Sequence, residues 1–159
     1  MIGIRDKGPG TRVCALICAA TLLMTGCGES SRATPAEVKE VVPVKNSVTI
    51  QINGKNFSVT LEDNPTARAF VERLPLEVDM TELNGNEKYF NLDGDLPSDS
   101  RRVGQIHAGD LMLFGSNCVV LFYKNFSTGY SYTRLGKLDN PTDLEKTLGA
   151  GNVRAKFGR

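Results

Sequence analysis

Short segments in which apolar and polar residues alternate constrain the fold of this chain more than any other feature of its sequence. Residues 47–52 and 57–61 alternate in this way and flank Asn53-Gly54, a dipeptide that two-residue hairpin turns prefer. Further segments with a strand pattern follow at residues 76–80, 88–92, 111–114, 118–123, 131–135 and 153–157. About seven or eight short strands in a domain of this size predict a closed or nearly closed β-barrel.

Two short helices are expected between these strands. Asn64-Pro65 supplies an N-cap and a first helical residue, and apolar residues then recur at helical spacing until Pro75 ends the segment. A second Asn-Pro pair opens a short helix over 140–148, and residues 93–105 are expected to form a loop. The predicted domain, residues 47–159, is therefore mostly β with two short helices.

The first 26 residues are predicted to be a signal peptide. Basic residues at positions 5, 7 and 12 precede an apolar run over 13–24. A helix of that length spans less than about 20 Å, which is too short for a hydrocarbon core of about 30 Å. The run ends in Leu-Met-Thr-Gly before Cys27, and this sequence resembles the lipobox of bacterial lipoproteins, in which the cysteine is acylated and becomes the new N-terminus.

Residues 27–46 are predicted to be a flexible tether that starts at the lipidated Cys27. The segment is polar at first, contains Pro35 and Pro43, and has no sustained apolar period. A flexible stretch of this length reaches roughly 20 to 25 Å, enough to hold a small domain off the lipid headgroups. These features predict a location in the cell envelope, with a lipid anchor on the extracytoplasmic side of a bacterial membrane.

The placement of the four cysteines agrees with lipidation. Cys14 and Cys18 would leave with the signal peptide and Cys27 would carry lipid, so the folded domain would keep one thiol, Cys118, and no internal disulfide. Cys118 heads an apolar run and is expected to be buried. The alternative, that Cys27 is an ordinary cysteine after a signal peptide cleaved elsewhere, stays open.

Charge and ligand chemistry exclude several function classes. The chain has a formal net charge of +1, and removal of residues 1–26 leaves 16 basic and 17 acidic residues, so we expect no nucleic-acid partner. One histidine, His107, and one free cysteine cannot supply a nitrogen and sulfur ligand set, so we expect neither a metal site nor a cofactor.

Three sequence stretches identify a likeness to a known family. They are Asn64-Pro65-Thr66-Ala67, Asn84-Gly85-Asn86-Glu87-Lys88-Tyr89-Phe90 and Gly109-Asp110-Leu111. Because it contains these stretches, the chain resembles the bacterial cyclophilin-like domain family over about residues 48–157. The resemblance implies a closed eight-stranded barrel capped by helices, akin to the barrel of the peptidyl-prolyl isomerases called cyclophilins.

The resemblance does not carry the isomerase motif. True cyclophilins use an arginine within a Phe-His-Arg stretch, whereas the histidine of this chain lies in Ile106-His107-Ala108. Prolyl isomerisation needs neither a base nor a nucleophile, because weakening of the amide resonance is enough to lower the barrier to rotation. A hydrogen-bond donor beside an apolar pocket for the proline ring could therefore suffice. We therefore leave the catalytic residue unassigned and take Arg134 as a candidate donor in a groove with Phe90, Phe114 and Phe122 as walls. The alternative stays open that each phenylalanine is a side chain of the barrel core and that each arginine is solvated or structural. Other arginines that could donate are Arg68, Arg101 and Arg102.

Two functions from different classes follow from this pattern. The first is a binding module without established catalysis, which would recognise a peptide, a protein segment or a small molecule. The alternative is a peptidyl-prolyl cis-trans isomerase that acts on secreted proteins, and the missing motif favours the module. An enzyme of small-molecule metabolism is a third possibility, with little support from the available side chains. A further binding surface could come from the aromatic residues near the segment 124–131, namely Tyr123, Phe126, Tyr130 and Tyr132.

Overall fold

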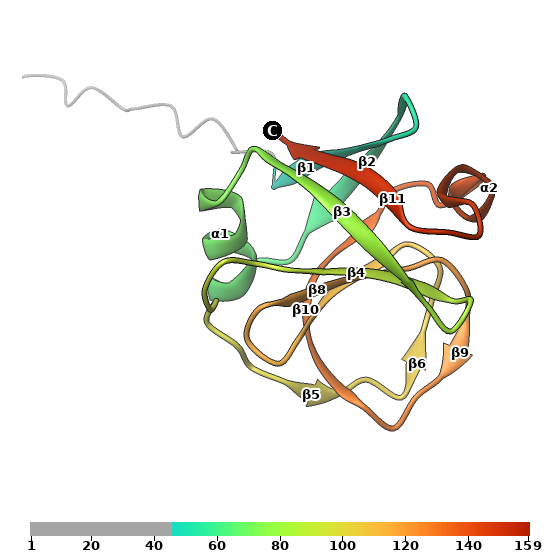
Figure 1. The fold of residues 1–159 in the computed structure, drawn as a ribbon. Helices are drawn as coiled ribbons and strands as arrows, with labels where there is room; N and C mark the ends of the chain where they lie inside the picture. Colours follow the sequence, from blue (N-terminus) through green and yellow to red (C-terminus); the bar gives the residue numbers. More distant parts are fainter. Residues whose placement is uncertain (1–45) are drawn as a thin grey trace, which may run out of the picture. The chain divides into compact units, whose positions relative to one another are not determined.

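A computed structural model describes residues 46–159, which fold into an antiparallel barrel flanked by two short helices (Figure 1). The first half of this region contains β1 (Ser47–Ile52), β2 (Lys55–Leu61), α1 (Pro65–Glu72), β3 (Leu76–Leu83), β4 (Glu87–Asn91), β5 (Arg101–Arg102) and β6 (Gln105–Ile106). The second half contains β7 (Asp110–Phe114), β8 (Cys118–Phe122), β9 (Phe126–Ser127), β10 (Ser131–Leu138), α2 (Leu144–Leu148) and β11 (Val153–Gly158). The predicted signal peptide and the tether up to residue 45 lie outside the described residues.

Eight strands close the barrel in the order β2-β1-β11-β3-β4-β8-β7-β10, and β10 pairs back onto β2. At this closure Gly136 pairs with Leu61. A Cβ on Gly136 would lie 2.5 Å from the carbonyl oxygen of Thr60, so a side chain there would push the two strands apart. The prediction of a mostly β, closed eight-stranded barrel with two short helices is confirmed.

The predicted turns have the backbone that their residues favour. Asn53 and Gly54 have φ of 49° and 78°, and Asn84 and Gly85 have φ of 56° and 68°. Two successive residues with positive φ are what a type I′ hairpin turn requires, and asparagine followed by glycine tolerates this best. These two turns fix the registers of the β1–β2 and β3–β4 hairpins.

The first helix begins as predicted, and the second begins later than predicted. The Asn64 side chain accepts a hydrogen bond from the Ala67 amide at 2.8 Å, with Pro65 in the first turn. In the second Asn-Pro pair, the Asn140 side chain instead accepts from the Thr142 amide at 2.9 Å, which forms a local turn. Helix α2 therefore starts at Leu144 rather than at residue 140.

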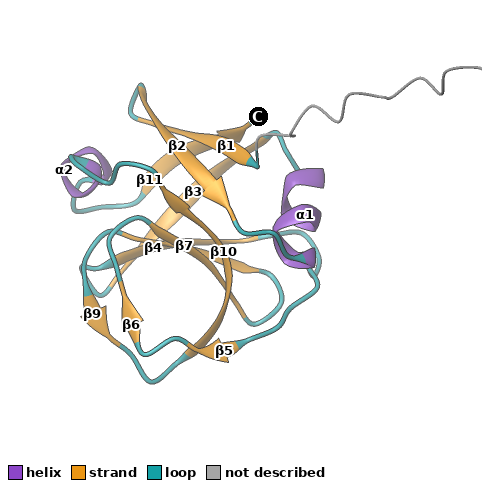
Figure 2. Ribbon diagram, turned by 180° about the vertical axis from the view of Figure 1, so that it is seen from behind, coloured by secondary structure: helices purple, strands orange, loops and turns teal. Residues whose placement is uncertain are grey.

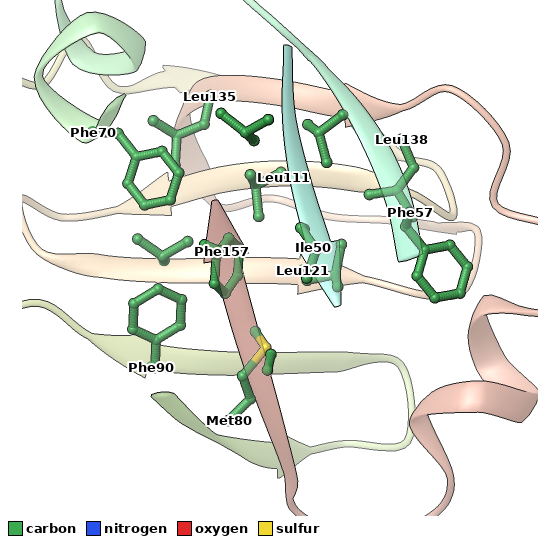
Figure 3. Packing of buried hydrophobic residues seen from close by; sticks show 14 of the residues in the cluster. Ile50, Phe57, Phe70, Met80, Phe90, Leu111, Leu121, Leu135, Leu138 and Phe157 are labelled. Carbon is green, nitrogen blue, oxygen red and sulfur yellow. The ribbon is translucent and has the colours of Figure 1, made fainter. Parts of the chain in front are cut away.

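Side chains inside the barrel form one continuous core (Figure 3). Strands β7 and β8 send alternate residues into it, so Leu111 and Leu121 point inward and have no exposed surface. Phe157 packs at the centre, with its ring 5.9 Å from that of Phe70 and 5.3 Å from that of Phe90. The core therefore joins helix α1 to strands on both sides of the barrel.

A second apolar cluster lies on the outer face of the barrel. It consists of Ile106, Met112, Val120, Phe122 and Tyr132. The short strands β5, β6 and β9 lie together on one side of the molecule, away from the C-terminus (Figure 2). The segment 93–105, expected to be a loop, contains β5 and the start of β6. These strands pair with β10 and β9, which are distant in the sequence, so a local pattern does not reveal them. Within residues 46–159, neither helix has the length and apolar character to cross a bilayer.

Candidate ligand-binding site

The outer face of the barrel carries a hollow with an aromatic lining, which we call the aromatic pocket. Its volume is about 270 Å³, and its walls are Leu83, Asn84, Glu87, Tyr89, Phe114, Cys118, Val120, Tyr130 and Tyr132. These residues come from the end of β3, the β3–β4 turn, strands β4, β7 and β8, and β10 with its preceding loop. Four of the nine side chains are aromatic rings, so the pocket is built mainly for apolar and π contacts.

Strand alternation explains why these residues share one face. In β4, Lys88 and Phe90 are buried on the inner side, so Glu87 and Tyr89 face outward. Tyr89 pairs with Val120, and Phe114 pairs with Cys118 in the neighbouring hairpin. Adjacent strands therefore place their outward side chains in rows across the pocket floor.

Three rings form a corner of the pocket. The ring of Phe114 lies 6.1 Å from that of Tyr130 in an edge-to-face arrangement and 5.6 Å from that of Tyr132. Phe114 is 46% exposed and Tyr130 is 66% exposed, whereas Tyr132 is buried. The corner thus has a fixed base in Tyr132 and two accessible rings above it.

The pocket disfavours ionisation of the groups that line it. Burial, and then the negative charge of Glu82, raise the pKa of the Glu87 carboxyl. Burial, with a contribution from Glu87, also raises the pKa of the Cys118 thiol. Burial raises the pKa of Tyr132 to about 12, again with a contribution from Glu87. Cys118 is half-buried rather than fully buried, and its raised pKa disfavours the thiolate, which is the nucleophilic form.

A second hollow, which we call the arginine cleft, adjoins the aromatic pocket. Its volume is about 480 Å³, and its walls are Glu62, Asn64, Pro65, Thr66, Pro97, Ser98, Asp99, Arg101, Arg102, Val103, Tyr132, Thr133 and Arg134. The Arg101 guanidinium donates to Asp99 at 2.8 and 3.1 Å and lowers the pKa of that carboxyl. Tyr132 lines both hollows and forms the wall between them.

Two hydrogen bonds hold the loop that forms one side of the arginine cleft. The Thr66 hydroxyl donates to the Pro97 carbonyl at 2.7 Å, and the Asp99 amide donates to the Thr133 hydroxyl at 2.9 Å. The loop is therefore fastened to helix α1 on one side and to strand β10 on the other. This fixes the width of the cleft.

A buried ion pair lies on the inner side of β4, behind the pocket. Lys88 is fully buried and donates to Glu82, to the Gly149 carbonyl at 2.9 Å and to the Gly151 carbonyl at 2.7 Å. The Tyr123 hydroxyl also donates to Glu82, at 2.9 Å. Burial alone would raise the pKa of Glu82, but the hydrogen bonds from Lys88 and Tyr123 outweigh it and lower that pKa. The Lys88 charge is thus fully engaged away from the pocket.

The four groove residues expected from sequence do not come together. Phe90 lies in the barrel core against Phe157, and Phe122 lies in the outer cluster, 5.4 Å from Tyr132 between ring centres. Phe114 lines the aromatic pocket, whereas Arg134 lines the arginine cleft. The Arg134 guanidinium is half-exposed and 4.0 Å from the buried carboxylate of Asp110.

The other arginines and His107 are also distributed over the surface. Arg101 and Arg102 line the arginine cleft, and Arg68 pairs with Asp63 at 2.5 Å. The imidazole Nδ1 of His107 lies 3.7 Å from Asp110. Within residues 46–159, no group of three or more His, Cys, Asp or Glu side chains converges as a metal site would require.

Sequence reasoning did not assign Leu83, Glu87, Tyr89 and Val120 to the site. The binding surface predicted near the segment 124–131 includes Tyr130 and Tyr132, and both line the aromatic pocket. Tyr123 and Phe126, the other members of that group, do not line the pocket: Tyr123 is buried and bonded to Glu82, and Phe126 packs on Phe122 at 5.7 Å. The alternation in β4 could have pointed to Tyr89. Neighbouring residues of a strand point to opposite faces, so Tyr89 faces outward when Phe90 faces the core.

Fold and site together define a closed antiparallel barrel with a ligand-sized pocket on its outer face. The chain belongs to the cyclophilin-like family, whose sequence profile matches residues 50–158. Among solved structures, the hypothetical protein AF2241 from Archaeoglobus fulgidus, determined in solution, is similar to it with a TM-score of 0.52 and 18% sequence identity, over 73% of this chain and 95% of that chain. This likeness concerns the fold. No curated protein matches the chain.

Proposed function

We propose that this protein is a lipid-anchored binding module of the bacterial cell envelope that holds its ligand in the aromatic pocket. The ligand is a peptide segment, part of a protein, or a small molecule, and binding involves no prolyl isomerisation. One observation carries the proposal. In the described part of the chain, the large hydrophobic residues that remain exposed are Leu83, Phe114 and Tyr130, and all three line this pocket.

Exposed apolar side chains that gather at one hollow are typical of a binding site, because scattered apolar residues on a surface do not form a cavity. The aromatic rings supply contact area at a low cost in conformational entropy. Tyr132 and Val120 form a buried base beneath them. The pocket is therefore largely preformed, which reduces the ordering that a ligand must impose.

The arrangement of arginines supports binding over isomerisation. None of the nine side chains that line the aromatic pocket is an arginine, and Arg134 lies across Tyr132 in the other hollow. A prolyl ring seated against Phe114 would thus lack an adjacent guanidinium donor. Isomerase activity remains the rival function, with Arg134 as its donor and the arginine cleft as its site.

Membrane attachment rests on the sequence before the barrel. The apolar run over 13–24 and the small residues before Cys27 support cleavage and lipidation at that cysteine. Two or three acyl chains would give stable anchoring, whereas one chain is marginal. The ligand would then be met within reach of the tether.

Pocket variants test the binding function. The full chain is screened for binding to an array of short peptides, and the best binder is measured by calorimetry. Phe114→Ala is expected to weaken binding at least about tenfold, because it removes the central ring of the corner. Arg102→Ala, in the arginine cleft, is the control and should bind as the native protein does. Equal losses in both variants would contradict the assignment to the aromatic pocket.

A proline-peptide exchange assay tests the rival function. We expect the native chain to leave the cis-trans exchange rate of the peptide at its uncatalysed value, measured by NMR. Acceleration that disappears in Arg134→Ala but survives in Arg68→Ala would establish the isomerase and overturn the binding-only function.

The anchor is tested by expression of Cys27→Ser in cells fed with labelled fatty acid. The native chain is expected to incorporate label and sediment with membranes, and the variant is expected to do neither. Undiminished labelling of the variant would contradict lipidation at Cys27.

A further inference from the structure

The aromatic pocket holds one acidic side chain and no basic one among the residues that line it. The acidic group is Glu87, which faces outward from β4 beside Tyr89. Its carboxyl is half-buried and has no hydrogen bond or ion pair with another residue in the range 46–159. A half-buried carboxyl with no partner in the protein is free to pair with a ligand group that carries the opposite charge.

The charged residues near Glu87 do not neutralise its carboxylate. Lys88 is the next residue, but it points to the other side of the strand and is committed to Glu82 and two backbone carbonyls. Glu82 adds a negative charge close enough to raise the pKa of Glu87. Within residues 46–159, Glu87 is thus the charged side chain that lines the pocket, and no basic side chain pairs with it.

The rings around the carboxyl also attract positive charge. The faces of aromatic rings are negative, so a positively charged group that lies over them is attracted. Tyr89, Phe114, Tyr130 and Tyr132 supply rings from four segments, and those of Phe114 and Tyr130 stand nearly perpendicular, at 89°. Aromatic rings from several segments, with a carboxyl beside them, form the kind of enclosure that binds organic ammonium groups.

We propose that the aromatic pocket binds an organic ammonium group, with the rings on its alkyl surface and the Glu87 carboxylate as its counter-ion. This inference rests on the proposed binding function and names the chemistry of the ligand. A volume of about 270 Å³ accommodates a trimethylammonium group or the end of a lysine side chain. The ammonium group comes either from a small quaternary amine or from a lysine of a peptide.

An isosteric pair of probes isolates the charge. Choline and 3,3-dimethylbutan-1-ol have nearly the same shape, but only choline is a cation. With the full chain in a neutral maltoside detergent, choline is expected to bind about tenfold tighter than the alcohol. Binding is measured by the NMR shifts of labelled tyrosine rings. A second pair, N-acetyl-lysine methylamide and its Nε-acetyl form, tests the lysine source in the same way.

Two substitutions locate the effect. Glu87→Gln is expected to remove the preference for the cation and leave the binding of the neutral alcohol unchanged. Glu62→Gln removes a carboxyl from the arginine cleft and is the matched control, which should keep the preference. Phe114→Ala should weaken both probes.

The outcomes separate this inference from the binding function. Preference for choline, for the lysine amide or for both, lost in Glu87→Gln, supports the inference and identifies the source. Equal binding of cation and isostere, reduced by Phe114→Ala, overturns the ammonium specificity and keeps the binding module. Failure of both cations to bind also overturns the inference, and the peptide array then decides the binding function separately.

Discussion

The inside and the outside of the same barrel wall differ in what their aromatic residues do. On the inner side, Phe157, Phe70 and Phe90 are buried in the core, where Phe157 packs against each of the other two rings (Figure 3). On the outer side, Phe114 and Tyr130 are accessible and stand around a hollow. The two faces are separated only by the alternation of side chains along the strands.

A small barrel can thus combine a stable core with a binding site, because the two occupy opposite faces of the same wall. The inner face is closed by all eight strands and by α1, so each of its residues contributes to burial. The outer face is covered only in part, with β5, β6 and β9 on one side, and the aromatic pocket lies on this same outer face. Substitutions on the inner face should therefore change stability, and those on the outer face should change binding.

The largest expected effect is that of Phe157→Ala. Loss of a fully buried ring in contact with two others should lower the free energy of unfolding by about 3 to 5 kcal/mol. Urea unfolding followed by tyrosine fluorescence measures the loss, since the chain contains no tryptophan. A loss no larger than that of Phe114→Ala would break the distinction between the two faces.

Lys88→Met is expected to have the next largest effect. It leaves Glu82 without its buried partner, so the free energy of unfolding should fall by about 2 to 4 kcal/mol. The double variant Lys88→Met with Glu82→Leu removes both charges and should recover part of this loss in the same urea experiment. If the double variant is less stable than the single one, the unpaired carboxylate is not the cause.

Phe114→Ala should cost much less stability than Phe157→Ala, although both substitutions remove the same side chain. Because Phe114 is 46% exposed, we expect a loss of about 1 kcal/mol or less. The same variant should lose the binding that the aromatic pocket supplies. A stable variant with intact binding would place the ligand elsewhere.

Glu87→Gln has the smallest expected effect on stability, and its sign depends on pH. Because burial and Glu82 raise the pKa of Glu87, the folded protein binds the proton more tightly than the unfolded chain does. The stability from protonated Glu87 is thus present below the ordinary carboxyl pKa and is lost as the pH rises through the raised pKa.

The Gln variant should consequently be slightly more stable than the native protein at about pH 7, by about 0.5 kcal/mol, and the gain should vanish at about pH 3.5. Urea unfolding at the two pH values measures the difference. A gain of the same size in Glu62→Gln, whose carboxyl is exposed in the arginine cleft, would indicate a general charge effect and would contradict an origin in the pocket.

Local patterns in the sequence were sufficient for most of the fold. Asn53-Gly54 and Asn84-Gly85 predict turns because few other residue pairs tolerate two positive φ angles in succession. Asn64-Pro65 predicts a helix start for a similarly local reason. The second Asn-Pro pair misled the prediction, since an asparagine side chain can cap either a turn or a helix.

The site was less predictable, because strand alternation does not say which face is inside when both faces carry aromatic residues. In β4, Lys88 is buried and the neighbouring Glu87 faces the pocket. A buried lysine is unusual, because charged residues normally lie on the surface. Phe90, a predicted groove wall, lies in the core, whereas its neighbour Tyr89 lines the pocket.

Local sequence patterns predict the eight barrel strands, two of their turns, the start of the first helix and the family of the barrel, but not β5, β6 and β9. The closure of the barrel at Gly136, the buried partner of Lys88 and the position of Glu87 among aromatic rings follow from contacts between distant strands. The physical reason is that turns and caps depend on neighbours in the chain, whereas a pocket depends on side chains that distant strands bring to one face.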